Sequence, residues 1–492
     1  MSLEKSGGFR SRSAKGEQKK VQPKKAPVKK AAPKRTSNNR SPRAEVRELR
    51  ALGVDKPREI AFEVLERVRT GDAYANLVLP RLLTKQKMDT RDAGFATEIT
   101  YGTLRNQGLL DAVIASAANR PLKDIDSEVL DVLRIGAYQV LFTRVEDHAA
   151  VDTTVKMVGG LKKFNATGFA NAVMRTITRT PAEEWLDKLE PEGEIARLAF
   201  RTAHPEWIAQ SFSRLLPASE LEEALAADSK RPTVHLVARP GEISAEELAL
   251  ITGGEEGKYS PYAVYLEGGD PSDIDPVQQG LAAVQDEGSQ LIARALVEAP
   301  VEGDDQGRWL DLCAGPGGKA ALIGALARMD GARVDAIEVS DHRAKLVERS
   351  VRGLPVKVHV GDGRTIALDD GYDRAIVDAP CSGLGALRRR PEARWRKQES
   401  DIGPLHTLQY ELLESAVNRV RTGGIVVYST CSPDLRETRE VVDRALANFD
   451  IEELDAAAYL PGMEGTGEGK SVQMWPHRHG TDAMFVAVLR KR

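Results

Sequence analysis

Apolar residues recur at helical spacing over residues 57–177 of the chain. Two groups show this spacing most clearly: Ile60, Phe62, Val64, Leu65 and Val68, and then Val129, Val132, Leu133, Ala137, Val140 and Leu141. Residues three and four apart share one face of a helix, so each group marks the buried side of an amphipathic helix. Glycines punctuate the later segments, and no strand pattern interrupts them. Residues 55–180 are therefore predicted to form an all-α domain.

The pattern changes over residues 185–275, where short apolar runs alternate with polar turns. Residues 233–238 predict a strand that ends before an Arg-Pro-Gly turn, and residues 262–266 predict a second strand. Between them, Ser244 precedes two glutamates in the manner of a helix N-cap. We expect a small α+β domain here, joining two larger domains.

The C-terminal region, residues 276–492, begins with a predicted helix and continues with alternating strands and helices. One face of that helix would carry Val277, Leu281, Val284, Leu291, Ile292 and Leu296. Apolar strands are predicted at residues 309–313, 334–338, 356–360, 375–378 and 425–429, and most are separated by helices at 320–329, 343–351 and 405–420. This alternation predicts a Rossmann-like α/β domain with a parallel sheet, whose ligands bind beyond the carboxyl ends of the strands. The fold class is thus multidomain: all-α, then small α+β, then α/β.

Charge is distributed unevenly along the 492 residues, although the net charge is only −3. Residues 1–50 hold 16 Lys and Arg against 4 Asp and Glu, a balance of +12, which leaves −15 for the rest. This tail is rich in lysine and proline and has little to bury, so we expect it to be disordered. A basic tail beside an acidic body attracts polyanions, nucleic acid above all, although it could also act only as a solubilising extension.

Composition also excludes several classes of protein. No apolar run approaches the ~18 residues that a membrane span requires, and the charged N-terminus lacks the apolar core of a secretory signal. Three cysteines rule out a disulfide scaffold and a four-cysteine metal site. We expect a soluble, cytoplasmic protein without a metal and without a membrane partner, and no sequence feature indicates its oligomeric state.

A glycine-rich turn follows the first strand of the α/β region, with the sequence DLCAGPGGK over residues 311–319. Glycines at such a turn let a ligand approach the backbone, and the following helix presents free N–H groups. The spacing is neither G-x-G-x-x-G nor that of a phosphate loop. Glu338 ends the second strand, where a carboxylate can accept both hydroxyls of a ribose, and Asp362 follows the third, where it could meet an adenine edge. A nucleoside-containing ligand is predicted.

Two cysteines lie at the ends of later strands. Cys381 belongs to the run DAPCSGLG that begins at Asp378, and Cys431 belongs to the run YSTCSP. A lone cysteine is more often a small buried apolar residue than a nucleophile, but two at the same edge of a sheet favour thiolate chemistry. Cys313, within the glycine-rich turn, is expected to serve packing.

These motifs resemble, in order and spacing, the RsmB/Sun family of RNA cytosine-5 methyltransferases. The resemblance rests on DLCAGPGGKA, DAPCSGLGALRRRPEARWR and YSTCSPDLRETREVV, and upstream RDAGFATEITYGTLR and GFANAVMRTI resemble a NusB-like RNA-binding domain. Three positions depart from the family: residues 437–440 replace its Glu-Asn-Glu, residues 482–485 lack its glycine, and the strand near His235 lacks its Arg-x-Asn. These departures bear on RNA contacts more than on methyl transfer.

The resemblance implies roles for individual residues. Cys431 would be the nucleophile that attacks carbon 6 of cytosine, Cys381 would serve product release, and Asp378 would position the base. S-adenosyl-L-methionine would be the cofactor, bound by Cys313, Ala314, Gly315, Pro316, Gly317, Gly318, Lys319, Glu338, Asp362 and Asp378. RNA would be the partner, contacted by Arg388, Arg389, Arg390, Arg394, Trp395 and Arg396.

The NusB-like region favours small-subunit (16S) ribosomal RNA as the substrate, and other readings stay open. The enzyme could act on transfer RNA or another RNA. In the related DNA enzymes the cysteine after proline, here Cys381, would be the nucleophile instead. A non-catalytic RNA-binding factor would need neither cysteine, so the intact pair argues against that class.

Overall fold

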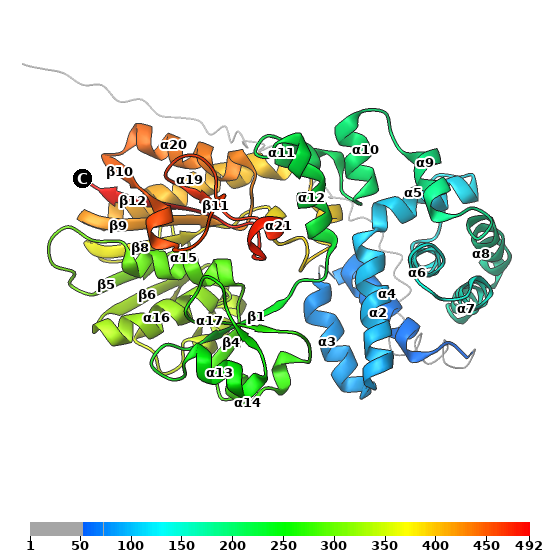
Figure 1. Ribbon diagram of the computed structural model, residues 1–492, viewed down its shortest axis with the longest axis horizontal. Coiled ribbons are helices and arrows are strands. Elements are labelled where there is room, and N and C mark those ends of the chain that lie inside the picture. Colours follow the sequence, from blue (N-terminus) through cyan, green and yellow to red (C-terminus); the bar gives the residue numbers. More distant parts are fainter. Residues whose placement is uncertain (1–52, 72) are drawn as a thin grey trace, which may run out of the picture. The chain divides into compact units, whose positions relative to one another are not determined.

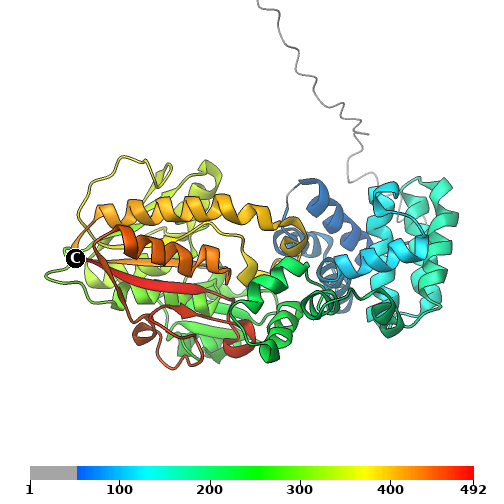
Figure 2. The same cartoon turned by 90° about the horizontal axis from the view of Figure 1, so that it is seen from above.

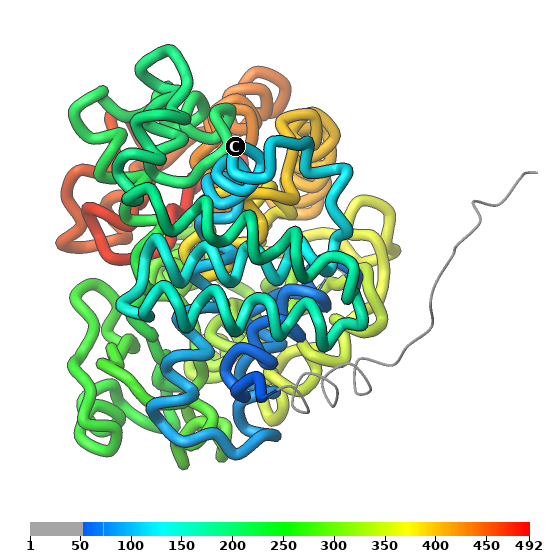
Figure 3. Tube along the Cα trace, turned by 90° about the vertical axis from the view of Figure 1, so that its right-hand side faces the viewer, coloured from blue at the N-terminus to red at the C-terminus, as the bar shows by residue number. Residues whose placement is uncertain are grey.

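Helices fill the N-terminal part of the chain, as the apolar spacing predicts (Figure 1). The computed structural model describes residues 53–71 and 73–492, so the prediction for the basic tail lies outside the described residues. The helices are α2 (Lys56–Gly71), α3 (Ala75–Gln86), α4 (Thr90–Arg105), α5 (Gln107–Ala118), α6 (Ser127–Phe142), α7 (Asp147–Gly160) and α8 (Phe164–Ile177). Their apolar faces share one core that includes Phe62, Leu110 and Leu133. The blue-to-cyan trace in Figure 3 follows these elements in order.

Four further helices lead out of this region: α9 (Ala182–Leu189), α10 (Glu194–Arg201), α11 (Glu206–Ser213) and α12 (Ala218–Ser229). The last two pack around Phe212 and Leu225, in a core that also takes in Leu384 and Leu387 from the C-terminal region. None of the described helices is long and apolar enough to cross a membrane.

A small antiparallel sheet follows, in the order β2-β3-β1-β4. Its elements are β1 (Val234–Ala238), α13 (Ala245–Thr252), β2 (Glu255–Glu256), β3 (Ala263–Leu266), α14 (Asp275–Gln278) and β4 (Ala282–Val284). The two predicted strands are confirmed, and Ser244 caps α13 by accepting a hydrogen bond from Glu247 N.

The single helix predicted from Val277 to Leu296 is wrong in its first half. The chain turns at Gly280, whose φ of +77° favours glycine, and Val284 then pairs with Leu236 as part of the small sheet. Val277 lies in the short helix α14, whereas Leu291, Ile292 and Leu296 lie in a separate helix, α15 (Glu287–Glu298). The spacing of Val277, Leu281 and Val284, four and then three residues, is typical of one face of a helix. It gave no sign that residues 282–284 pair with β1 at the edge of the small sheet.

The larger sheet has the order β10-β12-β9-β8-β5-β6-β7, with β11 (Val472–Gln473) paired to β12. Its parallel strands are β5 (Arg308–Asp311), β6 (Arg333–Glu338), β7 (Val356–Val360), β8 (Tyr372–Asp378) and β9 (Val420–Thr430). The strands β12 (Phe485–Lys491) and β10 (Ile451–Leu454) extend it in antiparallel fashion, which the prediction of a parallel sheet missed. The Rossmann-like α/β fold is confirmed.

Successive side chains of these strands point to opposite faces of the sheet. Trp309 and Ile376 face α15 and α16 (Gly318–Asp330), whereas Leu310 and Val377 face α19 (Ile402–Arg419) and α20 (Arg439–Asn448). The last two helices lie side by side along the sheet in Figure 2. Between β6 and β7, α17 (Asp341–Ser350) packs through Ala344 and Val347. Helices on both faces leave the strand ends as the open edge of the sheet.

A short helix, α18 (Ala393–Arg396), connects the sheet region with the N-terminal helices. The indole of Trp395 donates to the carbonyl of Leu104, with an N–O distance of 2.8 Å. The side chain of Glu392 accepts from Ala75 N at 3.0 Å. Side chains from the C-terminal region therefore satisfy backbone groups of the N-terminal helices.

Candidate active site

The two cysteines predicted to act together lie in contact. Cys381 follows β8 and Cys431 follows β9, and these strands are parallel neighbours, so their carboxyl ends meet. The two sulfur atoms are 3.3 Å apart. The backbone also joins the two loops, since Gly385 N donates to the carbonyl of Cys431 at 2.9 Å. The site therefore holds a close dithiol at the edge where ligands of α/β sheets bind.

The thiol pair is polarised. The hydrogen bond from Cys381 lowers the pKa of Cys431, and the positive charges of Arg390 and Lys319 act in the same direction, against burial and the charge of Asp378. The same hydrogen bond, together with burial, raises the pKa of Cys381 well above its usual range. A thiolate is the nucleophilic form of cysteine, and the lowered pKa favours this form at Cys431 over Cys381.

Asp378 is fixed beside this pair by two donors. The hydroxyl of Ser429 donates to Oδ1 at 3.0 Å, and Nζ of Lys319 donates to Oδ2 at 2.9 Å. Lys319 also donates to the hydroxyl of Ser289 at 2.8 Å. Burial opposes the charge of Lys319, yet Asp378 raises the pKa of this lysine on balance. Lys319 thus links the glycine-rich turn to the strand end that carries Asp378.

Glu437 joins the loops that follow the two cysteines, and its side chain is fully buried. Its Oε1 accepts from Ser382 N at 2.8 Å and from Nε2 of Gln409 at 3.0 Å. Its Oε2 accepts from the hydroxyls of Ser432, at 2.7 Å, and of Ser382. Since Ser382 follows Cys381 and Ser432 follows Cys431, this carboxylate holds the two sulfur-bearing loops at a fixed spacing. Sequence reasoning noted Glu437 only as part of a departure from the family motif.

The glycine-rich turn has little room for side chains. A Cβ on Gly315 would collide with the Glu338 carboxylate, and Gly317 has a φ of +116° with Ser350 and Val347 only 2.9–3.0 Å from where its Cβ would lie. At Gly318, by contrast, a Cβ would meet only ordinary contacts with a glutamine at 3.6 Å or more. The N-terminus of α16 is therefore open toward the site, while the turn behind it is closely packed.

Asp311, at the end of β5, is buried beneath this turn. Its Oδ1 accepts from Cys313 N at 3.1 Å, and its Oδ2 has no hydrogen-bond partner among the described residues. Burial raises the pKa of Asp311 to about 7. Cys313 packs against the apolar core on the α19 side of the sheet, and burial raises the pKa of its thiol.

The acidic residues proposed for the nucleoside lie at the next two strand ends. Glu338 ends β6, is nearly buried, accepts from Ser340 N at 2.9 Å and lies 3.2 Å from the Arg343 guanidinium. Asp362 follows β7, is partly exposed and pairs with Arg364, whose hydrogen bonds hold the pKa of this carboxyl below its usual range. The open edge therefore carries, in spatial order, Cys431, Asp378 with Cys381, the glycine-rich turn, Glu338 and Asp362.

The arginines predicted to contact RNA occupy different environments. Arg388 and Arg389 point inward, where both pair with Asp286 and Asp482 at distances of 2.7–3.2 Å. The contact with His235 and the positive charges of Arg389 and Arg388 hold the pKa of Asp286 far below its usual range, against the effect of burial. These two arginines therefore join the Cys381 loop to α15 and to the chain before β12.

The second part of the arginine cluster lies in α18 and is also internal. Arg394 is fully buried and donates to the carbonyls of Ala203 and Asp228 at 2.9 and 3.1 Å. Arg396 donates to the carbonyl of Val68, and Trp395 is held by its indole hydrogen bond. Of the six residues predicted to contact RNA, Arg390 alone is exposed.

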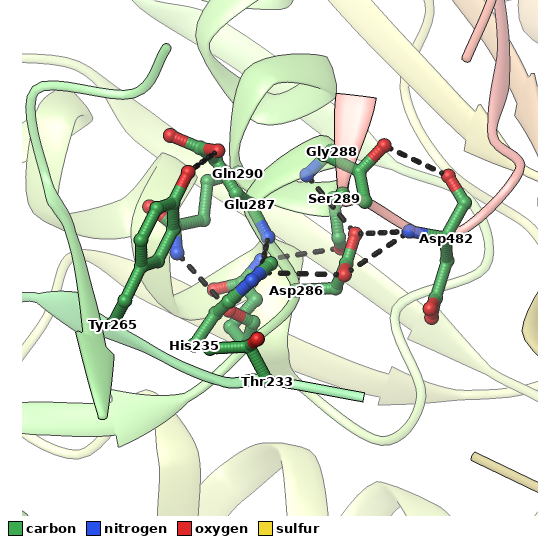
Figure 4. Close-up of polar contacts among 12 residues, drawn as sticks. Thr233, His235, Tyr265, Asp286, Glu287, Gly288, Ser289, Gln290 and Asp482 are labelled. Carbon is green, nitrogen blue, oxygen red and sulfur yellow. Dashed lines mark hydrogen bonds and ion pairs between the residues drawn. The ribbon is translucent and has the colours of Figure 1, made fainter. Parts of the chain in front are cut away.

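A polar segment at the start of α15 also shapes the site, and sequence reasoning missed it. Gln285–Gln290 has the sequence QDEGSQ, and four of these six residues are buried. Figure 4 shows Asp286 between His235 and the backbone of Asp482, with Glu287 N donating to Nδ1 of His235 at 3.1 Å. Ser289 is the partner of Lys319. A run of polar residues directly after an apolar strand was the available signal.

No cluster of three or more histidine, cysteine or acidic side chains is arranged for a metal within residues 53–71 and 73–492.

Comparisons with known proteins agree with this architecture. Residues 295–490 match the family described as 16S rRNA methyltransferase RsmB/F, and residues 55–179 match the NusB family. A protein of Mycobacterium tuberculosis strain H37Rv that is named as a methyltransferase is 54% identical over 444 residues, covering 89% of this chain and 97% of that protein. The ribosomal RNA small subunit methyltransferase B of Pseudomonas putida is 33% identical over 453 residues, covering 88% and 98%.

Among solved structures, the crystal structure of PH0851 is 23% identical and has a TM-score of 0.71, covering 92% of this chain and 99% of that one. At that identity the likeness shows a common fold. The sequence likeness to the Pseudomonas enzyme runs through both matched regions and the segment between them. The chain therefore belongs to the RsmB/F methyltransferase family and carries an N-terminal NusB domain, as its sequence motifs predict.

Proposed function

We propose that this methyltransferase transfers a methyl group from S-adenosylmethionine to carbon 5 of a cytosine in RNA, through a covalent bond to Cys431. The observation that carries the proposal is the dithiol, with sulfur atoms 3.3 Å apart and Asp378 beside it. Carbon 5 of cytosine is a weak nucleophile, and adding a thiolate to carbon 6 activates it. The hydrogen bond from Cys381 lowers the pKa of Cys431 and so favours the thiolate form of Cys431.

The residues of the glycine-rich turn fit S-adenosylmethionine. The open N-terminus of α16 offers N–H groups to a carboxylate, and the glycines there leave the backbone accessible. Glu338 and Asp362 stand at the next strand ends, as a ribose and an adenine require. When bound, this cofactor supplies an electrophilic methyl group.

The residues of this chain then divide the work. The Cys431 thiolate forms a bond to carbon 6, and the displaced electron pair makes carbon 5 nucleophilic. Asp378, held by Ser429 and Lys319, is placed to accept hydrogen bonds from the polar edge of the base. After methylation, a base takes the proton from carbon 5, the electrons of that C–H bond restore the carbon 5–carbon 6 double bond, and the electron pair of the carbon–sulfur bond returns to Cys431. We assign the base to Cys381 in its thiolate form, since this residue lies against the reacting sulfur.

The proposed substrate is 16S ribosomal RNA. The support comes from the relatives named as small-subunit ribosomal RNA methyltransferases and from the NusB domain. Arg390, exposed beside the dithiol, is proposed to contact this RNA. Bisulfite mapping of ribosomal and transfer RNA from cells with and without the gene tests the assignment. Loss of one 5-methylcytosine from 16S RNA is expected, and loss from transfer RNA alone would contradict it.

Two variants test the covalent mechanism. With RNA that contains 5-fluorocytosine, Cys431→Ala should form no adduct that survives a denaturing gel. With ordinary RNA, Cys381→Ala should methylate and then remain attached through Cys431, giving a slow band whose peptide map locates the bond. Adducts that form only when Cys381 is present would assign the nucleophile to Cys381 instead.

A further inference from the structure

Tyr74, from the NusB domain, reaches the same face as the dithiol. The Arg390 guanidinium lies over its ring, 5.0 Å from the centroid. Tyr74 stands directly before α3 and is 40% exposed. An arginine stacked on a tyrosine has the geometry of a cation–π pair, and this pair is reachable from solvent.

The position of this pair is fixed from both sides. Ala75, the residue after Tyr74, donates its N–H to Glu392, two residues beyond Arg390. On the other side, Arg390 N donates to the carbonyl of Ala386 at 3.1 Å, within the turn that Gly385 bonds to the Cys431 carbonyl. These hydrogen bonds connect the backbone next to Tyr74 and Arg390 with the loop that carries Cys431. The charge of Arg390 contributes to the lowered pKa of Cys431.

Within the described part of the chain Arg390 forms no ion pair, and the same holds for Arg231 and Arg105 nearby. The carboxylate of Glu98 acts electrostatically on Arg105 without forming an ion pair with it. Arg105 lies over the ring of Tyr101, 5.6 Å from the centroid, and both Arg105 and Arg231 act electrostatically on that tyrosine.

These cations differ from Arg388 and Arg389, whose charges are balanced by Asp286 and Asp482. Glu392 is the carboxylate on which Arg390 acts electrostatically, but it forms no ion pair with Arg390, and its Oε1 accepts from Ala75 N. Unpaired arginines alternating with tyrosines are the pattern of sites for single-stranded nucleic acid, where rings stack on bases and cations meet phosphates.

We propose that Tyr74 and Arg390 form a stacking platform for the nucleotide next to the target cytosine, and that Arg231 and Arg105 bind the phosphates of the same strand. This inference rests on the proposed function in so far as the ligand is the RNA substrate. It makes the NusB domain part of the substrate site itself. A target base must leave its stack to reach Cys431, and a platform for its neighbour would hold the strand open while it does so.

The test replaces the aromatic ring of Tyr74 with a large aliphatic side chain. Tyr74→Leu should raise the KM for RNA about tenfold or more, as expected for the loss of one base–aromatic stack, with unchanged S-adenosylmethionine affinity. Tyr74→Phe should behave as wild type, and Arg390→Lys, which keeps the charge without the plane, should fall between. Phe164→Leu is the matched control, since Phe164 is an exposed aromatic of the same domain at the start of α8, and it should change nothing.

A photo-cross-link separates the platform from a purely structural contact. RNA carrying 5-iodouridine on either side of the target cytosine should cross-link to Tyr74 in wild type and not in Tyr74→Leu. Normal KM and cross-linking elsewhere would overturn the proposal. A raised KM accompanied by a lowered Tm and weaker cofactor binding would also overturn it, because Tyr74 would then serve only to hold the NusB domain against the C-terminal region. Direct RNA binding by fluorescence anisotropy reports on the platform even if the cytosine-5 chemistry proves wrong, so the two failures are distinguishable.

Discussion

Glu437→Gln is expected to damage the chemistry of Cys431 without touching either cysteine. The glutamine side chain has the same size as glutamate, and its remaining oxygen can still accept from Ser382 N and Gln409. Its amide nitrogen, however, replaces the oxygen that accepts from the hydroxyls of Ser382 and Ser432. Those hydroxyls must turn to accept, and both loops that follow the cysteines lose their common anionic anchor.

The expected cost in stability follows from these bonds. Hydrogen bonds to a buried charged group contribute about 1.5–3 kcal/mol each, and neutral ones about 0.5–1.5 kcal/mol, so exchanging two of them lowers the free energy of unfolding by about 2–3 kcal/mol. A domain of ordinary stability tolerates such a loss. The expected loss of reactivity is larger than the loss of stability suggests. The lowered pKa of Cys431 depends first on the hydrogen bond from Cys381, and that bond requires the two loops to keep their spacing. Below the pKa, each unit by which it rises reduces the thiolate fraction about tenfold.

The assay is the rate of iodoacetamide alkylation of Cys431 against pH, followed by peptide mass spectrometry, which needs neither RNA nor cofactor. Asp373→Asn is the matched control: Asp373 is also a fully buried carboxylate with three donors, Gln306 N, Arg308 N and Arg421, but it lies near the opposite end of β8. Both variants should lose comparable stability in urea. Only Glu437→Gln should shift the Cys431 profile to higher pH. The charge that this substitution removes raises the pKa of Cys381, so its loss alone would favour a thiolate, and a shift to higher pH therefore reports the lost alignment of the Cys381 hydrogen bond. An unshifted profile in a destabilised Glu437→Gln variant would refute the reasoning and leave Glu437 a structural residue.

Three further outcomes are expected. Because the Cys381 hydrogen bond is the first cause of the lowered pKa of Cys431, Cys381→Ala should move the acid limb of adduct formation to higher pH; an unchanged limb would mean that the nearby cations dominate. Gly318→Val should fold, as circular dichroism can verify, since a Cβ there meets only Gln285 at 3.6 Å or more, yet lose S-adenosylmethionine affinity by calorimetry. Deleting residues 1–45 should weaken RNA binding most at low salt and leave the methylated nucleotide unchanged, whereas a change of site would make the tail a specificity element.

Sequence patterns predicted those helices and strands whose apolar residues have the spacing of the element and are also the residues that it buries. The N-terminal helices, the strands β5 to β9 and the Ser244 cap were all accessible, because each has a period or a cap within a few residues. The dithiol followed from the same logic, since parallel strands bring their carboxyl ends together. β4 was not accessible, because its pairing with β1 depends on a partner almost fifty residues away.

The arginine cluster shows where sequence reasoning about charge reaches its limit. Arginines in a row indicate a polyanion site only if their charges face solvent, and the sequence does not tell which acids will fold against them. Asp286 and Asp482 lie about a hundred residues away on either side of Arg388 and Arg389 and balance both. Arg390, the next residue, has no such partner among the described residues. Neighbouring arginines of one motif therefore have different roles, since Arg388 and Arg389 are internal ion-pair partners and Arg390 is exposed, and only the structure distinguishes them.

The placement of α18 bears on how the protein is divided into modules. Arg394 and Trp395 belong to the catalytic region in sequence, yet Arg394 is enclosed by the helices before the small sheet, and Trp395 fits against Gly108, where even a Cβ would not fit. A catalytic fragment that began after the NusB domain would expose the Trp395 indole and remove its acceptor, the carbonyl of Leu104. It would also remove the carbonyl of Val68, to which Arg396 donates. The NusB domain is therefore not a detachable adaptor. Recombination or truncation at the sequence boundary between the two family matches would break a shared interior, so the two halves are expected to be inherited, expressed and degraded together.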